Sequence, residues 1–200
     1  MTYEFSTDFN NALPQNDLAL IPAGTLAKVT MTLRPGGFGP GQWLTKSDRT
    51  GSVYLNTELT ILEGPYAKRK VYHLIGIEGA KRNAKGEDTW GMNGRTMIRS
   101  ILESARNIHP NDRSQNAIEG RTINDLLELM GIEFGIKIGV EEDKSGNYQP
   151  KNTVLSIITP NYSSYASVMG VSGRKSQASD TVETETPAPS TFAQPSWLNR

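Results

Sequence analysis

Val53-Tyr54-Leu55-Asn56-Thr57-Glu58-Leu59-Thr60-Ile61 is a segment in which every second residue from Val53 onward is apolar, except Thr57. Val53 and every second residue after it fall on one side of an extended chain, and the residues between them fall on the other. A period of two residues is typical of a β-strand with one buried face. The sequence therefore predicts a half-buried strand over about residues 52–63.

The segments on either side show the same alternation. Residues 24–34 predict an earlier strand, and residues 67–77 predict a later one that follows a tight turn at residues 63–66 and places His73 on its inward face. Residues 134–140 and 153–159 predict two final strands, joined by a hairpin turn at residues 144–147.

Helical spacing is confined to the middle of the chain. Residues 94–107 predict one helix, and residues 122–130 predict a second, short one whose inward residues are Ile123, Leu126, Leu127 and Met130. Residues 35–43 contain four glycines and two prolines, which predicts a long loop, and the polar residues 78–93 predict another.

The order is three strands, a helical segment and two strands. This predicts a mainly-β domain with a helical insertion, built as a five-stranded OB-like barrel, although other five-stranded α+β folds share the order. We expect the folded domain to span residues 1–165. Residues 166–200 are rich in Ser, Thr, Pro, Ala and Glu and predict a disordered C-terminal tail.

Composition excludes several classes of protein. The chain has no cysteine, which rules out disulfides, zinc–thiolate sites and thiol nucleophiles. No apolar run is long enough to cross a membrane, and the polar N-terminus does not have the pattern of a secretory signal. His73 and His109 have no nucleophile or metal-ligand partner nearby in the sequence, so we expect neither an enzyme nor a cofactor nor a metal site.

Charge is unevenly distributed along a chain whose formal net charge is zero. Residues 28–106 contain 13 Lys or Arg and 7 Asp or Glu, whereas residues 176–200 contain 1 basic and 3 acidic residues. A basic body with an acidic tail is compatible with nucleic-acid binding, and it is also compatible with ordinary surface charge.

Cationic and aromatic residues gather where an OB barrel binds oligonucleotides, at its second and third strands and at the loops between strands 1 and 2 and strands 4 and 5. Single strands are bound by cations along the phosphates and by aromatic rings stacked on the bases. The candidate nucleic-acid-binding residues are Arg34, Phe38, Trp43, Lys46, Arg49, Tyr54, Tyr66, Lys68, Arg69, Lys70, Tyr72, Lys144, Tyr148 and Lys151.

Structural roles are open for the same residues. Trp43 could close one end of the barrel, and Tyr54 and Tyr72 could be cross-strand packing residues. Residues 68–70 could be a solvated strand edge.

Three segments, residues 21–25, 63–72 and 139–152, resemble a family of phage and prophage proteins regarded as OB-like single-stranded-DNA-binding proteins. The resemblance covers about residues 1–162 and implies DNA binding at the second and third strands, in the cytoplasm of a bacterial host. The glycine-rich loop at residues 35–42 and the tail depart from that family, which leaves the path of the DNA open.

We therefore expect a protein that binds single-stranded DNA with little sequence preference in replication or recombination, and whose tail contacts replication or recombination proteins. The alternative is a protein-interaction adaptor that uses the same face, and oligosaccharide binding is a third explanation. No membrane partner is expected, and homo-oligomerisation stays open.

Overall fold

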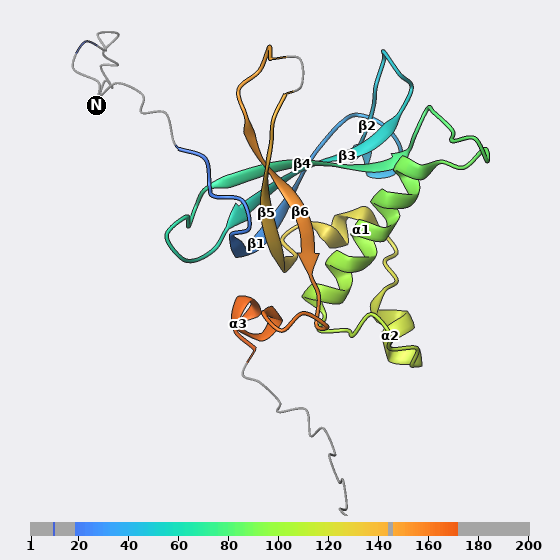
Figure 1. Cartoon of the computed structure of the whole chain (residues 1–200). Helices are drawn as coiled ribbons and strands as arrows, with labels where there is room; N and C mark the ends of the chain where they lie inside the picture. Colours follow the sequence, from blue (N-terminus) through green and yellow to red (C-terminus); the bar gives the residue numbers. More distant parts are fainter. Residues whose placement is uncertain (1–9, 11–18, 144–145, 172–200) are drawn as a thin grey trace, which may run out of the picture.

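A computed structural model describes residue 10 and residues 19–143 and 146–171 of the chain. Within them the protein is mainly β: an open, antiparallel, six-stranded sheet accompanied by a few short helices and one longer helix (Figure 1). The mainly-β fold class with a helical insertion is therefore confirmed.

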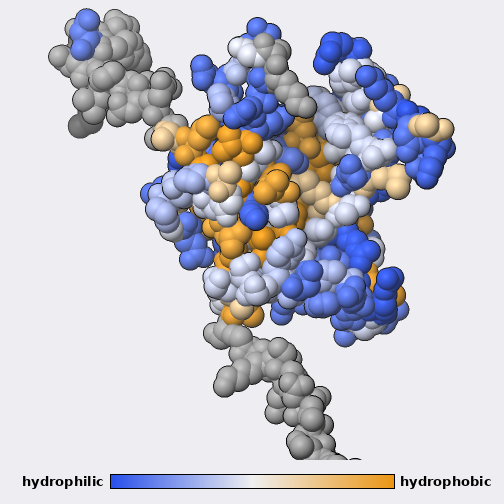
Figure 2. All heavy atoms as spheres, viewed as in Figure 1, coloured by the Kyte–Doolittle hydropathy of each residue, from blue (hydrophilic) through white to orange (hydrophobic). Residues whose placement is uncertain are grey.

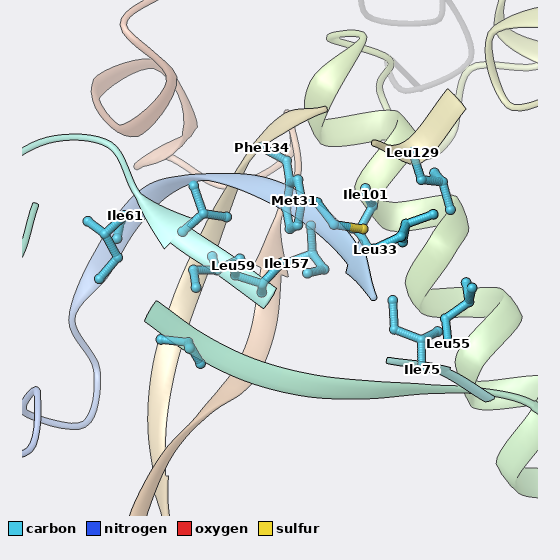
Figure 3. Packing of buried hydrophobic residues seen from close by; sticks show 14 of the residues in the cluster. Met31, Leu33, Leu55, Leu59, Ile61, Ile75, Ile101, Leu129, Phe134 and Ile157 are labelled. Carbon is cyan, nitrogen blue, oxygen red and sulfur yellow. The ribbon is translucent and has the colours of Figure 1, made fainter. Parts of the chain in front are cut away.

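All five predicted strands are present. They are β1 (Leu26–Arg34), β3 (Val53–Ile61), β4 (Lys70–Glu78), β5 (Glu133–Glu141) and β6 (Lys151–Ile158). Burial alternates along β1 and β3 as the sequence predicts, because every second side chain of a strand points to the same face. Met31, Leu55, Ile75 and Phe134 come from four strands and belong to one cluster of buried side chains (Figure 3).

The strands pair in the order β4–β3–β1–β5–β6. β4 and β6 lie at the two ends of this order, and no ladder joins them within the residues that the structure describes. A closed barrel is therefore not confirmed, and the sheet is open between β4 and β6.

The predicted loop at residues 35–43 holds more structure than its glycine content suggests. A single turn, η1 (Pro40–Gln42), leads into a short strand, β2 (Leu44–Lys46), which pairs with β3. Gly39 and Gly41 have φ angles of 72° and 65°, a left-handed conformation that glycine adopts without steric cost.

The long helix α1 (Thr89–Ala105) begins at Thr89, so the prediction of loop up to residue 93 and of a helix start at Gly94 was wrong. The cause is Asp88, whose carboxylate accepts hydrogen bonds from the Gly91 N–H at 2.8 Å and the Gly79 N–H at 2.9 Å. The bond from Gly91 caps the helix, the bond from Gly79 joins the cap to the end of β4, and both hold the pKa of Asp88 below its ordinary value.

The prediction of a helix over residues 122–130 was also wrong. The segment instead contains the single turn η2 (Leu126–Leu129), and a short helix, α2 (Gln115–Gly120), precedes it. Leu127, predicted to face inward, is exposed, and Leu129 is buried in its place. Asp125 and Glu128 form a capping box, which fixes the turn so that Leu129 faces the core.

A third helix, α3 (Tyr165–Met169), lies across the predicted domain boundary at residues 165 and 166. Tyr165 is buried, and its hydroxyl donates a hydrogen bond of 2.7 Å to the Ser104 carbonyl of α1. The ordered chain thus continues through α3, and the predicted disorder of residues 172–200 lies outside the described residues.

Candidate nucleic-acid interface

The outer faces of β1, β3 and β4 form one continuous surface, because the three strands are neighbours in register. Glu58 pairs with Thr32 on one side and with Tyr72 on the other, and Asn56 pairs with Arg34 and Leu74 in the next outward row. Side chains at these positions point away from the core, whose residues occupy the alternate positions of the same strands.

Arg34 and Tyr72 lie beside each other on this surface. The Arg34 guanidinium carbon lies 5.9 Å from the centre of the Tyr72 ring, within the range of a cation–π contact. Tyr72 is 53% exposed, so its ring is accessible to a ligand while the arginine restrains its orientation.

Lys70 lies on the same face and forms an ion pair with Glu58. Its ammonium group is 2.6 Å from the Glu58 carboxylate, and this hydrogen-bonded contact raises the pKa of Lys70 above its ordinary value. Lys70 is therefore cationic at neutral pH, but the negative charge of Glu58 offsets part of the positive charge of Lys70.

The turn between β3 and β4 carries a second cation–aromatic pair. The Arg69 guanidinium carbon lies 5.8 Å from the centre of the Tyr66 ring, and Tyr66 also packs partly against the core. Lys68 is exposed at a φ of 68°. This turn brings two cations to one end of the outer face.

The candidates in the segment between β1 and β3 lie in three different surroundings. Lys46 lies 5.3 Å from the centre of the Phe38 ring, which is a third cation–aromatic pair. Trp43 is partly buried against the core, in agreement with a structural role. Arg49 lines a separate hollow beside Trp90, and Trp90 packs edge-on against Tyr54 with ring centres 6.3 Å apart.

The β5–β6 hairpin contributes two described candidates. Tyr148 is 78% exposed, and Lys151 is 3.4 Å from the carboxylate of Glu141. Lys144 lies outside the described residues. Asp143 accepts hydrogen bonds from the Asn147 and Tyr148 N–H groups, which closes the described part of the turn.

A cleft of about 550 Å³ lies between β4 and β6 and brings the outer face and the hairpin together. Its lining residues are Leu20, Lys70, Tyr72, His73, Leu74, Glu141, Pro150, Lys151, Asn152 and Thr153. Burial lowers the pKa of His73 below its ordinary value, so the imidazole is neutral at pH 7.

Sequence reasoning missed most of this cleft. It placed Lys70, Tyr72 and Lys151 in the site, but it did not include Leu20, His73 or Leu74. The alternation of β4 correctly puts His73 on the inward side, and only the gap between β4 and β6 makes that side accessible.

Hydrophobic side chains are also exposed in the cleft, at Leu20 and Leu74, and in the groove between β6 and α1, at Leu155. Leu20, Leu74 and Leu155 are all exposed, and Leu155 reaches 62%. Figure 2 shows hydrophobic residues gathered over the middle of the visible face, where β6 lies, and hydrophilic ones around the hairpin tips.

The part of the chain that the structure describes holds no group of three or more His, Cys, Asp or Glu residues arranged to bind a metal ion. Among the same residues, no helix has the length and apolar character required to cross a membrane.

Comparison with known proteins returns no matching family model and no matching curated protein. The functional conclusion therefore depends on the geometry and chemistry of the site itself.

Proposed function

We propose that this protein binds single-stranded DNA, with little sequence preference, on the outer face of β1, β3 and β4. The observation that carries the proposal is the Arg34–Tyr72 pair on an exposed sheet face, accompanied by the Tyr66–Arg69 pair in the turn between β3 and β4 and the Phe38–Lys46 pair in the segment between β1 and β3. Three places thus combine a ring for a base with a cation for a phosphate.

This combination suits a single strand better than a duplex. Every base has a π-face, so stacking on a tyrosine or phenylalanine is largely independent of sequence, whereas the bases of a duplex are already stacked on one another. Cations along the same path bind the phosphates and release counterions.

We further propose that the sheet is an OB-like barrel left open on one side. The strand order β4–β3–β1–β5–β6 supports this, as does the position of α1 between β4 and β5 in the chain. OB-type barrels can be partly open, and they bind oligonucleotides at their second and third strands, which correspond here to β3 and β4. The resemblance to phage and prophage proteins supports replication or recombination as the setting, in a bacterial cytoplasm.

The test is a binding titration with fluorescently labelled oligo-dT and with a labelled duplex of matched length. We expect oligo-dT to bind more tightly than the duplex, and its affinity to fall steeply as salt rises. Equal affinity for the two, or no binding to either, contradicts the proposal.

A protein-interaction adaptor is the second candidate, and the exposed Leu74 and Leu155 favour it. Apolar patches on a surface commonly mark protein interfaces. Apolar association depends weakly on salt, so affinity for a protein partner that persists at high salt, together with no oligo-dT binding, would favour the adaptor.

A further inference from the structure

The cleft between β4 and β6 has the properties of a small-ligand site. Its volume of about 550 Å³ falls within the range of about 300–1,000 Å³ typical of such sites. Tyr72, Leu74, Leu20 and Pro150 supply apolar surface, and His73 and Thr153 supply polar groups.

The two strand edges add backbone groups to the cleft. β4 pairs with β3 along one edge, and β6 pairs with β5 along one edge. On the opposite edge of such a strand, alternate residues direct their N–H and C=O groups outward. Donors and acceptors between apolar walls match a nucleobase, which has two flat faces and a hydrogen-bonding rim.

The wall opposite β4 is held in place by Asn152. Its side-chain amide donates to the Ile21 carbonyl at 2.8 Å and accepts from the Ile21 N–H at 2.9 Å. These two bonds attach the segment before β1 to β6 and position Leu20 at the cleft. On the other side, the Thr57 hydroxyl donates to the His73 carbonyl at 2.8 Å and anchors β4.

Cations lie on both sides of the cleft. Lys70 belongs to β4 and Lys151 to β6, and each is paired with a carboxylate, Glu58 and Glu141 respectively. The Lys151–Glu141 pair is exposed on both sides and contributes little stability, so a phosphate can replace Glu141 at low cost. The Glu58 side chain is only 17% exposed, so Lys70 keeps this partner and offers a phosphate the exposed side of its ammonium group.

We propose that this cleft binds one nucleotide of the DNA strand, with its base between Leu74 and Leu20 and its phosphates at Lys70 and Lys151. The strand then passes from the outer face, at Tyr72, through the open edge to the β5–β6 hairpin. The inference rests on the proposed function and adds a subsite to it.

The chain carries its own reporter of this site, because its two histidines are His73 and His109. His73 lines the cleft, whereas His109 lies between α1 and α2, where its Nδ1 accepts a hydrogen bond from the Asn111 N–H. The experiment follows the imidazole NMR signals of the full chain during titration with dTMP and with oligo-dT. We expect both ligands to shift the His73 signal and to leave the His109 signal in place.

The second part of the experiment fills the cleft with a bulky side chain and measures oligo-dT affinity. Thr153→Trp places bulk in the cleft, and Ser156→Trp places the same bulk in a different groove, between β6 and α1. One base stacked on an aromatic ring contributes at least about fivefold to affinity. We take this lower limit for a base packed between two leucines, and we expect a decrease of about fivefold in Thr153→Trp and wild-type affinity in Ser156→Trp. If Thr153→Trp does not fold, Leu20→Ser replaces it, because Leu20 is an exposed residue of the same cleft and does not belong to the outer face of β1, β3 and β4; the same decrease is expected.

The outcomes separate the two proposals. Two results overturn the cleft assignment but do not affect the proposed function. One is binding of oligo-dT without movement of the His73 signal, and the other is wild-type affinity for oligo-dT in the cleft variants. A His73 shift with dTMP but no oligo-dT binding supports the cleft as a nucleotide site and overturns the proposed function. No response to either ligand overturns both.

Discussion

Tyr72 is the residue on which the proposed interface depends most. Its ring is exposed, it is held by Arg34 and it borders the cleft, so its removal tests stacking with little effect on the core. We expect Tyr72→Ala to weaken oligo-dT binding by about 1–3 kcal/mol, measured by fluorescence anisotropy, with an almost unchanged midpoint of urea unfolding. Tyr162→Ala, at another exposed tyrosine, is the matched control and should bind as the wild type does. A decrease in stability with normal affinity would instead assign Tyr72 to packing.

The free energy of unfolding should depend on pH through His73. Burial lowers its pKa in the folded protein, so the unfolded chain binds this proton more readily than the folded chain does. The contribution of His73 to stability is therefore complete above the unfolded pKa of about 6.5 and decreases as the pH falls below it. We expect the free energy of unfolding to decrease from pH 8 to pH 5 by more in the wild type than in His73→Gln, measured by urea unfolding. Parallel pH profiles for the two proteins would show that His73 is not the responsible group.

At the scale of the element, α1 is attached to the sheet by a close approach between two glycines. A Cβ atom at Gly94 would lie 1.7 Å from the carbonyl oxygen of Gly76 in β4, so no side chain fits unless helix and strand separate. Alanine favours a helix over glycine by about 1 kcal/mol, yet we expect Gly94→Ala to destabilise the protein by about 1–3 kcal/mol. Urea unfolding measures the difference, and Asn93→Ala, at an exposed position of the same helix, should be neutral or stabilising. A stabilised Gly94→Ala variant would refute the close approach.

The turn between β3 and β4 makes an electrostatic prediction. Lys68 and Arg69 lie at one end of the outer face, whereas Lys81 and Lys85 lie in the loop between β4 and α1. We expect Lys68→Gln with Arg69→Gln to reduce the log–log salt slope of oligo-dT binding by about 0.7 for each phosphate that the variant no longer neutralises. The charge-matched control, Lys81→Gln with Lys85→Gln, should leave the slope nearly unchanged. An identical slope in both double variants would show that the turn faces away from the DNA.

The elements differ in how far the sequence predicts them. β1 and β3 alternate between a buried and an exposed face, and this pattern is visible in the residues themselves. The three-residue strand β2 is too short to show a period, and the start of α1 depends on a cap, Asp88, that joins two segments. The turn at residues 126–129 was mispredicted because a local capping box outweighs helical spacing.

At the scale of the whole molecule, the candidate site was predictable only in part. Aromatic and basic residues on β3, β4 and their turn are visible in the sequence as neighbours, and the structure places Tyr66 beside Arg69. The Arg34–Tyr72 pair and the cleft join segments far apart in the chain. The gap between β4 and β6 arises from how the strands pair, and no residue pattern in either strand predicts it.

The most direct test of the central claim is a map of the amides that respond to oligo-dT, obtained by NMR or by hydrogen exchange on the full chain. We predict that the responding amides lie in β1, β3 and β4, around Arg34, Glu58 and Tyr72, and that those of α2 and η2 stay unchanged. A response concentrated in α2 and η2, with the outer face of β1, β3 and β4 silent, would contradict the proposed interface.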